Sequence, residues 1–171
     1  MNYKSQQGVG LLEVLVALVI LAIGALGYVM LQVRALEATA ESSQRIQAIN
    51  IARDLAEHIR ANRNGWTGST SYQTELATTA AQAKAAATPD CASAGCNPAQ
   101  LADFDVAEIS SYATQYGMSL GMSACPGTSN RQCLFVAWGN TKPINSTTDT
   151  ASCTNETSYR VNSTCVMMEV Y

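Results

Sequence analysis

Residues 7–31 read QGVGLLEVLVALVILAIGALGYVML, and this stretch decides how the rest of the chain is organised. Its central part, from Val14 to Leu31, contains 18 residues and no charged side chain. A helix of 18 residues is about 27 Å long, close to the roughly 30 Å of hydrocarbon in a bilayer. The stretch therefore predicts a helix that can cross a membrane.

A cleaved secretory signal is the other interpretation of an apolar stretch near the amino terminus. Such a signal has a positive region, then a shorter apolar stretch, then a cleavage site with small residues. Here Lys4 is the only basic residue before the apolar residues, and a helical pattern continues after them. Removal of the whole apolar segment is therefore the weaker interpretation.

One carboxylate, Glu13, stands among these apolar residues. An ionised group inside a bilayer costs a few kcal/mol by insertion scales, so it requires a partner. Alternatively, Glu13 lies near the lipid headgroups, which its position early in the helix permits. The residue pattern alone leaves these two interpretations open.

The string from Gln7 to Leu18 resembles the class III signal of type IV prepilins. In that family a prepilin peptidase cuts after the glycine, so the resemblance implies a leader of residues 1–8 that ends at Gly8. Val9 would then be the first mature residue, with an N-methylated amine, although the family usually has Phe there. Glu13 would be the fifth mature residue, expected to neutralise the amino-terminal charge of a neighbouring subunit. A buried charge is tolerated mainly when it is paired in this way.

The helical pattern continues beyond the apolar half, residues 9–31, into a second half at residues 32–64. Apolar residues there recur mostly every three or four positions between polar ones, which is typical of an amphipathic helix packed on a domain. They are Leu36, Ala40, Ile46, Ile49, Ala52, Leu55, Ala56 and Ile59. Asn62, Asn64 and Gly65 predict the end of this helix, because Asn and Gly accept the left-handed conformation that follows a helix end. Gly24 and Gly27 permit either bending or close helix packing.

Six cysteines lie in the polar remainder, residues 65–171, which we expect to form a periplasmic globular head. They are Cys91, Cys96, Cys125, Cys133, Cys153 and Cys165. An even number of this kind favours disulfides over a zinc site, which often includes a His, and the only His, His58, lies far away on the predicted long helix. Turn residues between the first two pairs favour the sequential pairing 91–96, 125–133 and 153–165, out of 15 that six cysteines allow.

The head also has patterns of local structure. A weak helical pattern covers 75–87, and Asn97 followed by Pro98 predicts the start of a helix that continues toward Tyr116. Residues 117–124, 132–138 and 159–170 have the composition of strands, whereas 140–157 reads as a polar surface loop. These patterns predict the α+β class. The resemblance to type IV prepilins implies a pilin fold, with a long N-terminal helix packed on a small antiparallel sheet and stabilised by disulfides.

Two segments of the chain are similar to the minor pilin family PilV: RANRNG at residues 60–65, and the cysteine followed by PAQLA at 98–102 and by Asp105. The resemblance implies a minor pilin that helps to initiate type IV pilus assembly. Its expected partners are other minor pilins, the major pilin, a tip adhesin and the prepilin peptidase. The expected location is the bacterial inner membrane before assembly and the pilus tip afterwards. A minor pseudopilin of a type II secretion system is the alternative, and a single-pass anchored binding domain that never polymerises is another.

The composition excludes other classes of function. Ten Lys and Arg against 13 Asp and Glu give a net charge of −3, without a basic run, so we expect no binding to nucleic acid. The chain has no phosphate loop, zinc-protease motif or nucleophile elbow. We therefore expect no enzyme activity, with no catalytic residue, no metal and no cofactor.

Overall fold

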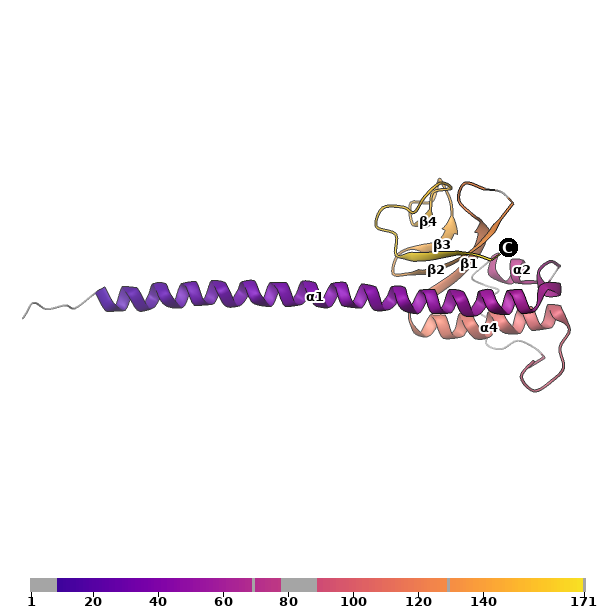
Figure 1. Cartoon of the computed structure of the whole chain (residues 1–171), viewed down its shortest axis with the longest axis horizontal. Helices are drawn as coiled ribbons and strands as arrows, with labels where there is room; N and C mark the ends of the chain where they lie inside the picture. The colour runs from indigo at the N-terminus through magenta and orange to yellow at the C-terminus, as the bar shows by residue number, and fades with distance from the viewer. Residues whose placement is uncertain (1–8, 69, 78–88, 129, 171) are drawn as a thin grey trace, which may run out of the picture. The chain divides into compact units, whose positions relative to one another are not determined.

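The computed structural model describes residues 9–68, 70–77, 89–128 and 130–170. The chain divides into two compact units, residues 1–42 and 43–171. Within the described part, the first unit is helical throughout, and the second contains helices and strands (Figure 1).

One long helix, α1 (Val9–Ala61), contributes to both units. The described side chains from Gly10 to Ile46 are exposed, and a buried stripe begins at Ala48. The stripe consists of Ala48, Ile51, Ala52, Leu55, Ala56 and Ile59 at steps of three or four residues. The predicted packing of the second half is thus correct only from Ala48 onward. Leu36, Ala40 and Ile46, which we expected to face a packed domain, are exposed.

The end of α1 lies where the sequence predicts it, but for a different physical reason. A short 3₁₀ turn, η1 (Arg63–Gly65), follows the helix, and Asn62 has a φ of −107°, outside the left-handed region. The Asn62 side chain instead donates a hydrogen bond of 2.8 Å to the Pro98 carbonyl. A Cβ on Gly65 would lie 2.7 Å from the same carbonyl oxygen. The glycine is therefore required by close packing.

Two further helices belong to the second unit. The first, α2 (Tyr72–Ala77), lies at the edge of the weak helical pattern expected over 75–87, of which residues 78–87 are outside the described residues. The second, α4 (Pro98–Gln115), has Asn97 as its N-cap and Pro98 as its first residue, as predicted. Asn97 and Gln100 form a reciprocal capping box, with bonds of 2.9 and 3.0 Å.

The main sheet has three antiparallel strands in the order β1 (Met118–Ala124), β2 (Gln132–Trp138) and β5 (Cys165–Glu169). The predicted strands at 117–124 and 132–138 are confirmed. The third is shorter than predicted, because the chain turns between Arg160 and Thr164 and Asn162 adopts a φ of +63°. Side chains on both faces of the central strand β2 are buried.

The expected surface loop at 140–157 is wrong in its central part. It contains β3 (Lys142–Asn145) and β4 (Ser152–Thr154), which pair in parallel. Ser152, Cys153 and Thr154 are completely or almost completely buried. The guanidinium of Arg160 stabilises the segment of β3 and β4. It donates hydrogen bonds to the Ser146 carbonyl at 2.8 Å and to the Ser152 hydroxyl at 2.7 Å.

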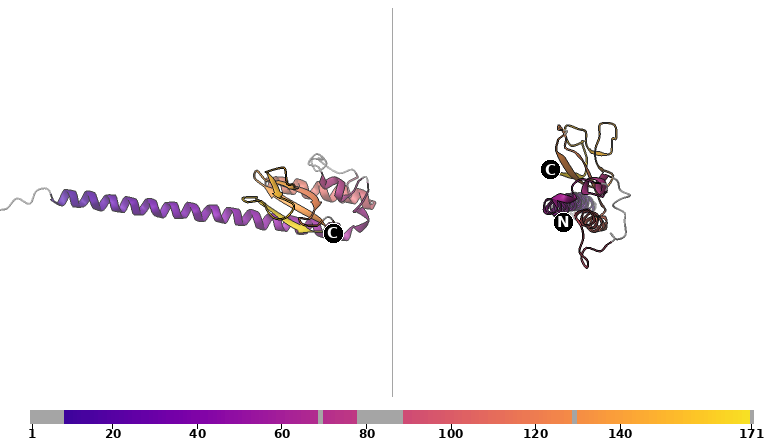
Figure 2. Two further views of the ribbon diagram at one scale, coloured as in Figure 1. Left: turned by 90° about the horizontal axis from the view of Figure 1, so that it is seen from above. Right: turned by 90° about the vertical axis from the view of Figure 1, so that its right-hand side faces the viewer.

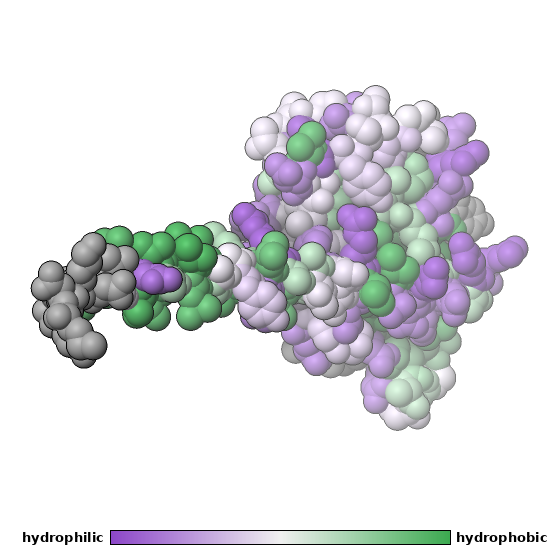
Figure 3. Space-filling view, turned by 60° about the vertical axis from the view of Figure 1, so that its left-hand side comes forward, coloured by the Kyte–Doolittle hydropathy of each residue, from purple (hydrophilic) through white to green (hydrophobic). Residues whose placement is uncertain are grey.

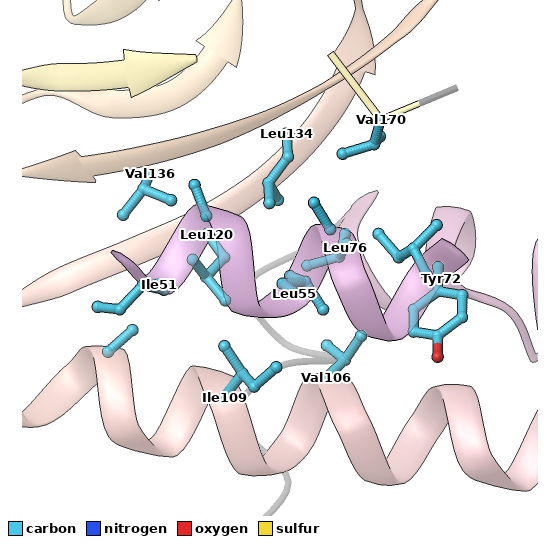
Figure 4. Close-up of a cluster of buried hydrophobic side chains, with 14 of the residues drawn as sticks. Ile51, Leu55, Tyr72, Leu76, Val106, Ile109, Leu120, Leu134, Val136 and Val170 are labelled. Atoms are coloured by element: carbon cyan, nitrogen blue, oxygen red, sulfur yellow. The ribbon is translucent and has the colours of Figure 1, made fainter. Parts of the chain in front are cut away.

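The core of the second unit has two parts, one on each face of β2. On one face, Leu134 and Val136 pack with side chains of α1, α2 and α4. Figure 4 shows the last turns of α1 between α4 and the sheet, and the views in Figure 2 agree. On the other face, Phe135 and Ala137 pack with four cysteines, Cys125, Cys133, Cys153 and Cys165.

Candidate functional site

The first half of α1 exposes apolar side chains around its whole circumference. Leu11 is 73% exposed, Leu21 69% and Leu31 71%. Figure 3 shows apolar residues covering this part of the helix. The helix is long and apolar enough to cross a membrane. A helix that is apolar on all sides needs lipid or other helices around it.

Glu13 is the only charged residue from Val9 to Val33. It lies in the second turn of α1 and is exposed. Among the residues that the structure describes, it forms no hydrogen bond or ion pair. Of the two expected processing residues, Gly8 lies outside the described residues and Val9 is the first residue of α1.

Two glycines occur further along the same half of α1. The helix continues through Gly24 and Gly27 without a break. A Cβ added at either position would meet nothing within 4 Å. The surface at these positions is therefore open to close approach by another helix, while bending during assembly stays a prediction.

The six cysteines form three disulfides in the second unit. The bonds join Cys91 to Cys96, Cys125 to Cys133 and Cys153 to Cys165, with Cα–Cα distances of 5.6, 4.9 and 5.9 Å. This is the sequential pairing that the local turns favour. The first bond closes a loop before α4, the second closes the β1–β2 hairpin, and the third joins β4 to β5. The described residues include no group of three or more His, Cys, Asp or Glu that could hold a metal.

A polar cluster joins α1, α2 and α4, and no sequence pattern predicted it. Its tyrosine and its carboxylate are buried, whereas its imidazole is 42% exposed. The Tyr72 hydroxyl donates to the Asp105 carboxylate, which lies 3.0 Å from Nδ1 of His58. Asn62 lies beside them, with its Nδ2 3.4 Å from the Tyr72 hydroxyl. Burial, followed by the bond to Asp105, raises the pKa of Tyr72. A sequence signal for this cluster would be polar residues at helical positions that are buried. Composition does not show which helical positions are buried, so the cluster could not be predicted.

A groove of about 520 Å³ lies between α1 and α4 next to this cluster. Ile51 and Ile109 line it and are almost fully buried, so they form its floor. Asp54 and Glu108 are exposed on its two walls. The complete lining is Gln47, Asn50, Ile51, Asp54, His58, Glu108, Ile109 and Tyr112.

The comparisons with known proteins match two consecutive parts of the chain. The prokaryotic N-terminal methylation motif matches residues 3–29, and a Tt1218-like family model, described as type IV pilin Tt1218, matches residues 30–107. Residues 3–107 of the chain are thus similar to type IV pilins and to their methylation motif. A search of curated proteins and one of solved structures each gave no match.

The pilin match agrees with the observed α+β fold, in which a long helix, a small antiparallel sheet and three disulfides occur together. The methylation motif in a pilin-like chain implies processing by prepilin peptidase and assembly with other pilins. The motif and the apolar helix also fit membrane anchoring before assembly. The matched pilin family is structural rather than enzymatic.

Proposed function

We propose that this pilin-like chain is a minor pilin that helps to initiate type IV pilus assembly and occupies a priming complex at the filament tip. The observation that carries the proposal is the exposed apolar half of α1, whose one carboxylate, Glu13, lies within a match to the methylation motif at residues 3–29. A similarity of residues 60–65 and 91–105 to the PilV family favours a minor pilin. Partners would be other minor pilins, the major pilin and a tip adhesin.

The chain would consist of four parts. Residues 1–8 are a leader that is removed after Gly8, and Val9 then carries an N-methylated amine. Residues 9–31 lie in the membrane or the filament core, and residues 32–64 form the second half of the helix. Residues 65–171 form the periplasmic head. In the filament, Glu13 would pair with the amino-terminal charge of a neighbouring subunit, which compensates the cost of burying the carboxylate.

Intact-mass measurement of the chain from cells with an active prepilin peptidase tests the processing step. The expected mass is that of residues 9–171 with three disulfides and with one methyl group in place of an amine hydrogen. Gly8→Val should leave the leader attached, because the family's peptidase cuts after glycine. Gly10→Ala is the matched control, since nothing lies within 4 Å of its Cβ position, and it should be processed normally. A wild-type chain that still begins at Met1 would contradict the proposal and support a simple membrane anchor.

The amount of the chain in sheared filaments tests the minor role. A minor pilin should be present at a small fraction of the major pilin, and its deletion should lower the number of filaments per cell. A major pilin would instead dominate the sheared fraction. Loss of protein secretion on deletion, with normal piliation, would support the pseudopilin alternative.

A further inference from the structure

The groove between α1 and α4 combines an apolar floor with negatively charged walls. Two carboxylates line it, Asp54 on α1 and Glu108 on α4, and the Asp54 carboxylate lies 3.7 Å from Nε2 of His58. The buried Asp105 does not line the groove and lies 3.0 Å from Nδ1 of His58. None of the eight lining residues is Lys or Arg. The imidazole of His58 adds at most one positive charge, so the groove is negative whether or not His58 is protonated.

One tyrosine that lines the groove, Tyr112, belongs to an aromatic pair. The Tyr112 ring, which lines the groove, meets the Tyr116 ring edge to face, with centroids 5.1 Å apart. The two rings are 46% and 41% exposed. A guanidinium can stack on an exposed aromatic face while it donates two bonds to a carboxylate.

The apolar floor suits the remainder of an arginine side chain. Arginine and lysine bury their methylene stems on apolar surface and keep the charged group at polar atoms. Ile51 and Ile109 provide that surface. The planar guanidinium can use the aromatic face and the carboxylates together, whereas an ammonium is a compact, strongly hydrated charge. This favours arginine over lysine as the occupant.

We propose that the groove between α1 and α4 binds an arginine side chain of a neighbouring pilin-like subunit. This inference rests on the proposed function, because it takes the neighbour from the filament. The groove lies between residues 47–58 of α1 and residues 108–112 of α4, so a subunit that packs against this face of the head is the partner that reaches it.

Site-specific photo-crosslinking in the full-length chain tests the inference. In piliated cells, the photoreactive residue p-benzoylphenylalanine replaces Tyr112. In the control the same residue replaces Val161, which is 91% exposed and lies between β4 and β5. The expected product from position 112 joins the chain to another pilin-like subunit through a peptide that contains an arginine. Position 161 should not give this product.

Removal of the groove charges is the second arm. Asp54→Asn combined with Glu108→Gln should lower the yield of the 112 crosslink roughly tenfold, the factor that one lost charge-assisted bond produces. Replacing the captured arginine with glutamate should also abolish the crosslink, and Asp54→Arg with Glu108→Arg should restore it. Replacement of that arginine with lysine should reduce the yield to an intermediate value.

Several results would overturn the inference. From position 112, they are a crosslink to lipid or to a protein without a pilin-like helix, a captured peptide without arginine, or no product above that of position 161. From the neutral double variant, the contradicting result is an unchanged crosslink yield. If the wild-type chain is cleaved and enters filaments while any of these occurs, the groove inference fails and the proposed function survives. If the wild-type chain is not cleaved or not found in filaments, the proposed function fails and the groove inference with it.

Discussion

Gly121 lies in β1 where the chain of β3 passes very close to it. A Cβ at this position would lie 2.1 Å from the carbonyl oxygen of Pro143, so Gly121→Ala requires a backbone to move. We expect a loss of about 1–3 kcal/mol in the free energy of unfolding, the usual cost of overpacking. Thermal unfolding of the full chain in detergent measures it. Gly95→Ala is the control, because a Cβ there meets nothing within 4 Å, and an equal loss in both variants would contradict the prediction.

Tyr72 supplies the hydroxyl that bonds the buried carboxylate of Asp105. Tyr72→Phe leaves that carboxylate without this donor, and an unsatisfied buried group costs about 1–3 kcal/mol. We therefore expect a lower midpoint of thermal unfolding. Tyr112→Phe is the matched control, because its hydroxyl bonds the exposed hydroxyl of Tyr116. A midpoint that Tyr72→Phe leaves unchanged would show that the cluster does not stabilise the head.

The same tyrosine predicts a dependence of stability on alkaline pH. Burial and the bond to Asp105 raise the pKa of Tyr72 in the folded chain above the ordinary value of about 10. Above pH 10 the unfolded chain therefore loses this proton more readily than the folded chain, and the stability that the raised pKa contributes falls as the pH rises. Between pH 9 and 11 the unfolding midpoint should fall more steeply in the wild type than in Tyr72→Phe. Parallel curves would contradict the assignment.

Single residues were predictable from sequence where their role is local. The cysteines and the capping residues Asn97 and Pro98 act on neighbours within a few positions, so the string of residues reveals them. Tyr72 and Asp105 are 33 residues apart, and no local pattern joins them. Gly65 was placed correctly at the end of the helix, but its reason is the approach of Pro98 from 33 positions away in the chain, which a sequence pattern does not contain.

Among the elements, those with a clear period were predictable. The long helix, α4, β1 and β2 follow from apolar spacing and end signals. The parallel pair β3 and β4 was missed because its strands have four and three residues, too short for an alternating pattern. The two strands are held in place by the disulfide of Cys153 and by the hydrogen bonds of Arg160. These contacts form only in the folded chain, so no sequence pattern shows them. The strand predicted at 159–170 was too long, because no period marks the turn at Asn162.

The three disulfides should contribute unequally to the stability of the head. They close loops with separations of 5, 8 and 12 residues, and chain entropy gives about 2–3 kcal/mol for loops of these lengths. Replacement of Cys153 and Cys165 by serine should lower the free energy of unfolding most, since both are buried against Phe135. Replacement of the partly exposed pair Cys91 and Cys96 should lower it least.

Chemical unfolding of each double variant measures this order. Non-reducing peptide mapping of the wild-type chain should recover 91–96, 125–133 and 153–165 as linked peptides. Free thiols at several positions would contradict the disulfides, and other linked pairs would contradict only the pairing.

At the scale of the whole molecule, we expect substitution of Glu13 to reduce pilus assembly and to leave membrane insertion unchanged. Glu13→Val makes the apolar half more apolar, so insertion should be unchanged. Incorporation into pili should fall, because the variant cannot pair with the amino-terminal charge of a neighbour. The measurement is the amount of the variant in the membrane fraction and in sheared filaments. Glu37→Ala is the control, an exposed carboxylate of the same helix that should assemble normally, and equal incorporation of Glu13→Val would contradict the assembly role.

The sequence predicted the division into an apolar helix and a disulfide-rich head, because composition changes sharply along the chain. It did not predict where packing on the head begins. Residues 32–46 have apolar positions at helical spacing, but Leu36 and Ile46 are 70% and 57% exposed. Spacing identifies a face of a helix, whereas the first buried residue, Ala48, depends on how far the sheet and α4 extend along that face.

The apolar circumference of α1 has a consequence for the energy of polymerisation. Lipid tails are as apolar as leucine side chains, so moving such a helix from a bilayer into a bundle of similar helices removes little apolar surface from water. If the proposed assembly is correct, residues 14–31 hold a subunit about equally well in the membrane and in the filament. In that proposal the preference for the filament comes from contacts that lipid cannot offer, such as a charge for Glu13 and complementary surfaces on the head. A filament built in this way could return its subunits to the membrane without a large hydrophobic barrier.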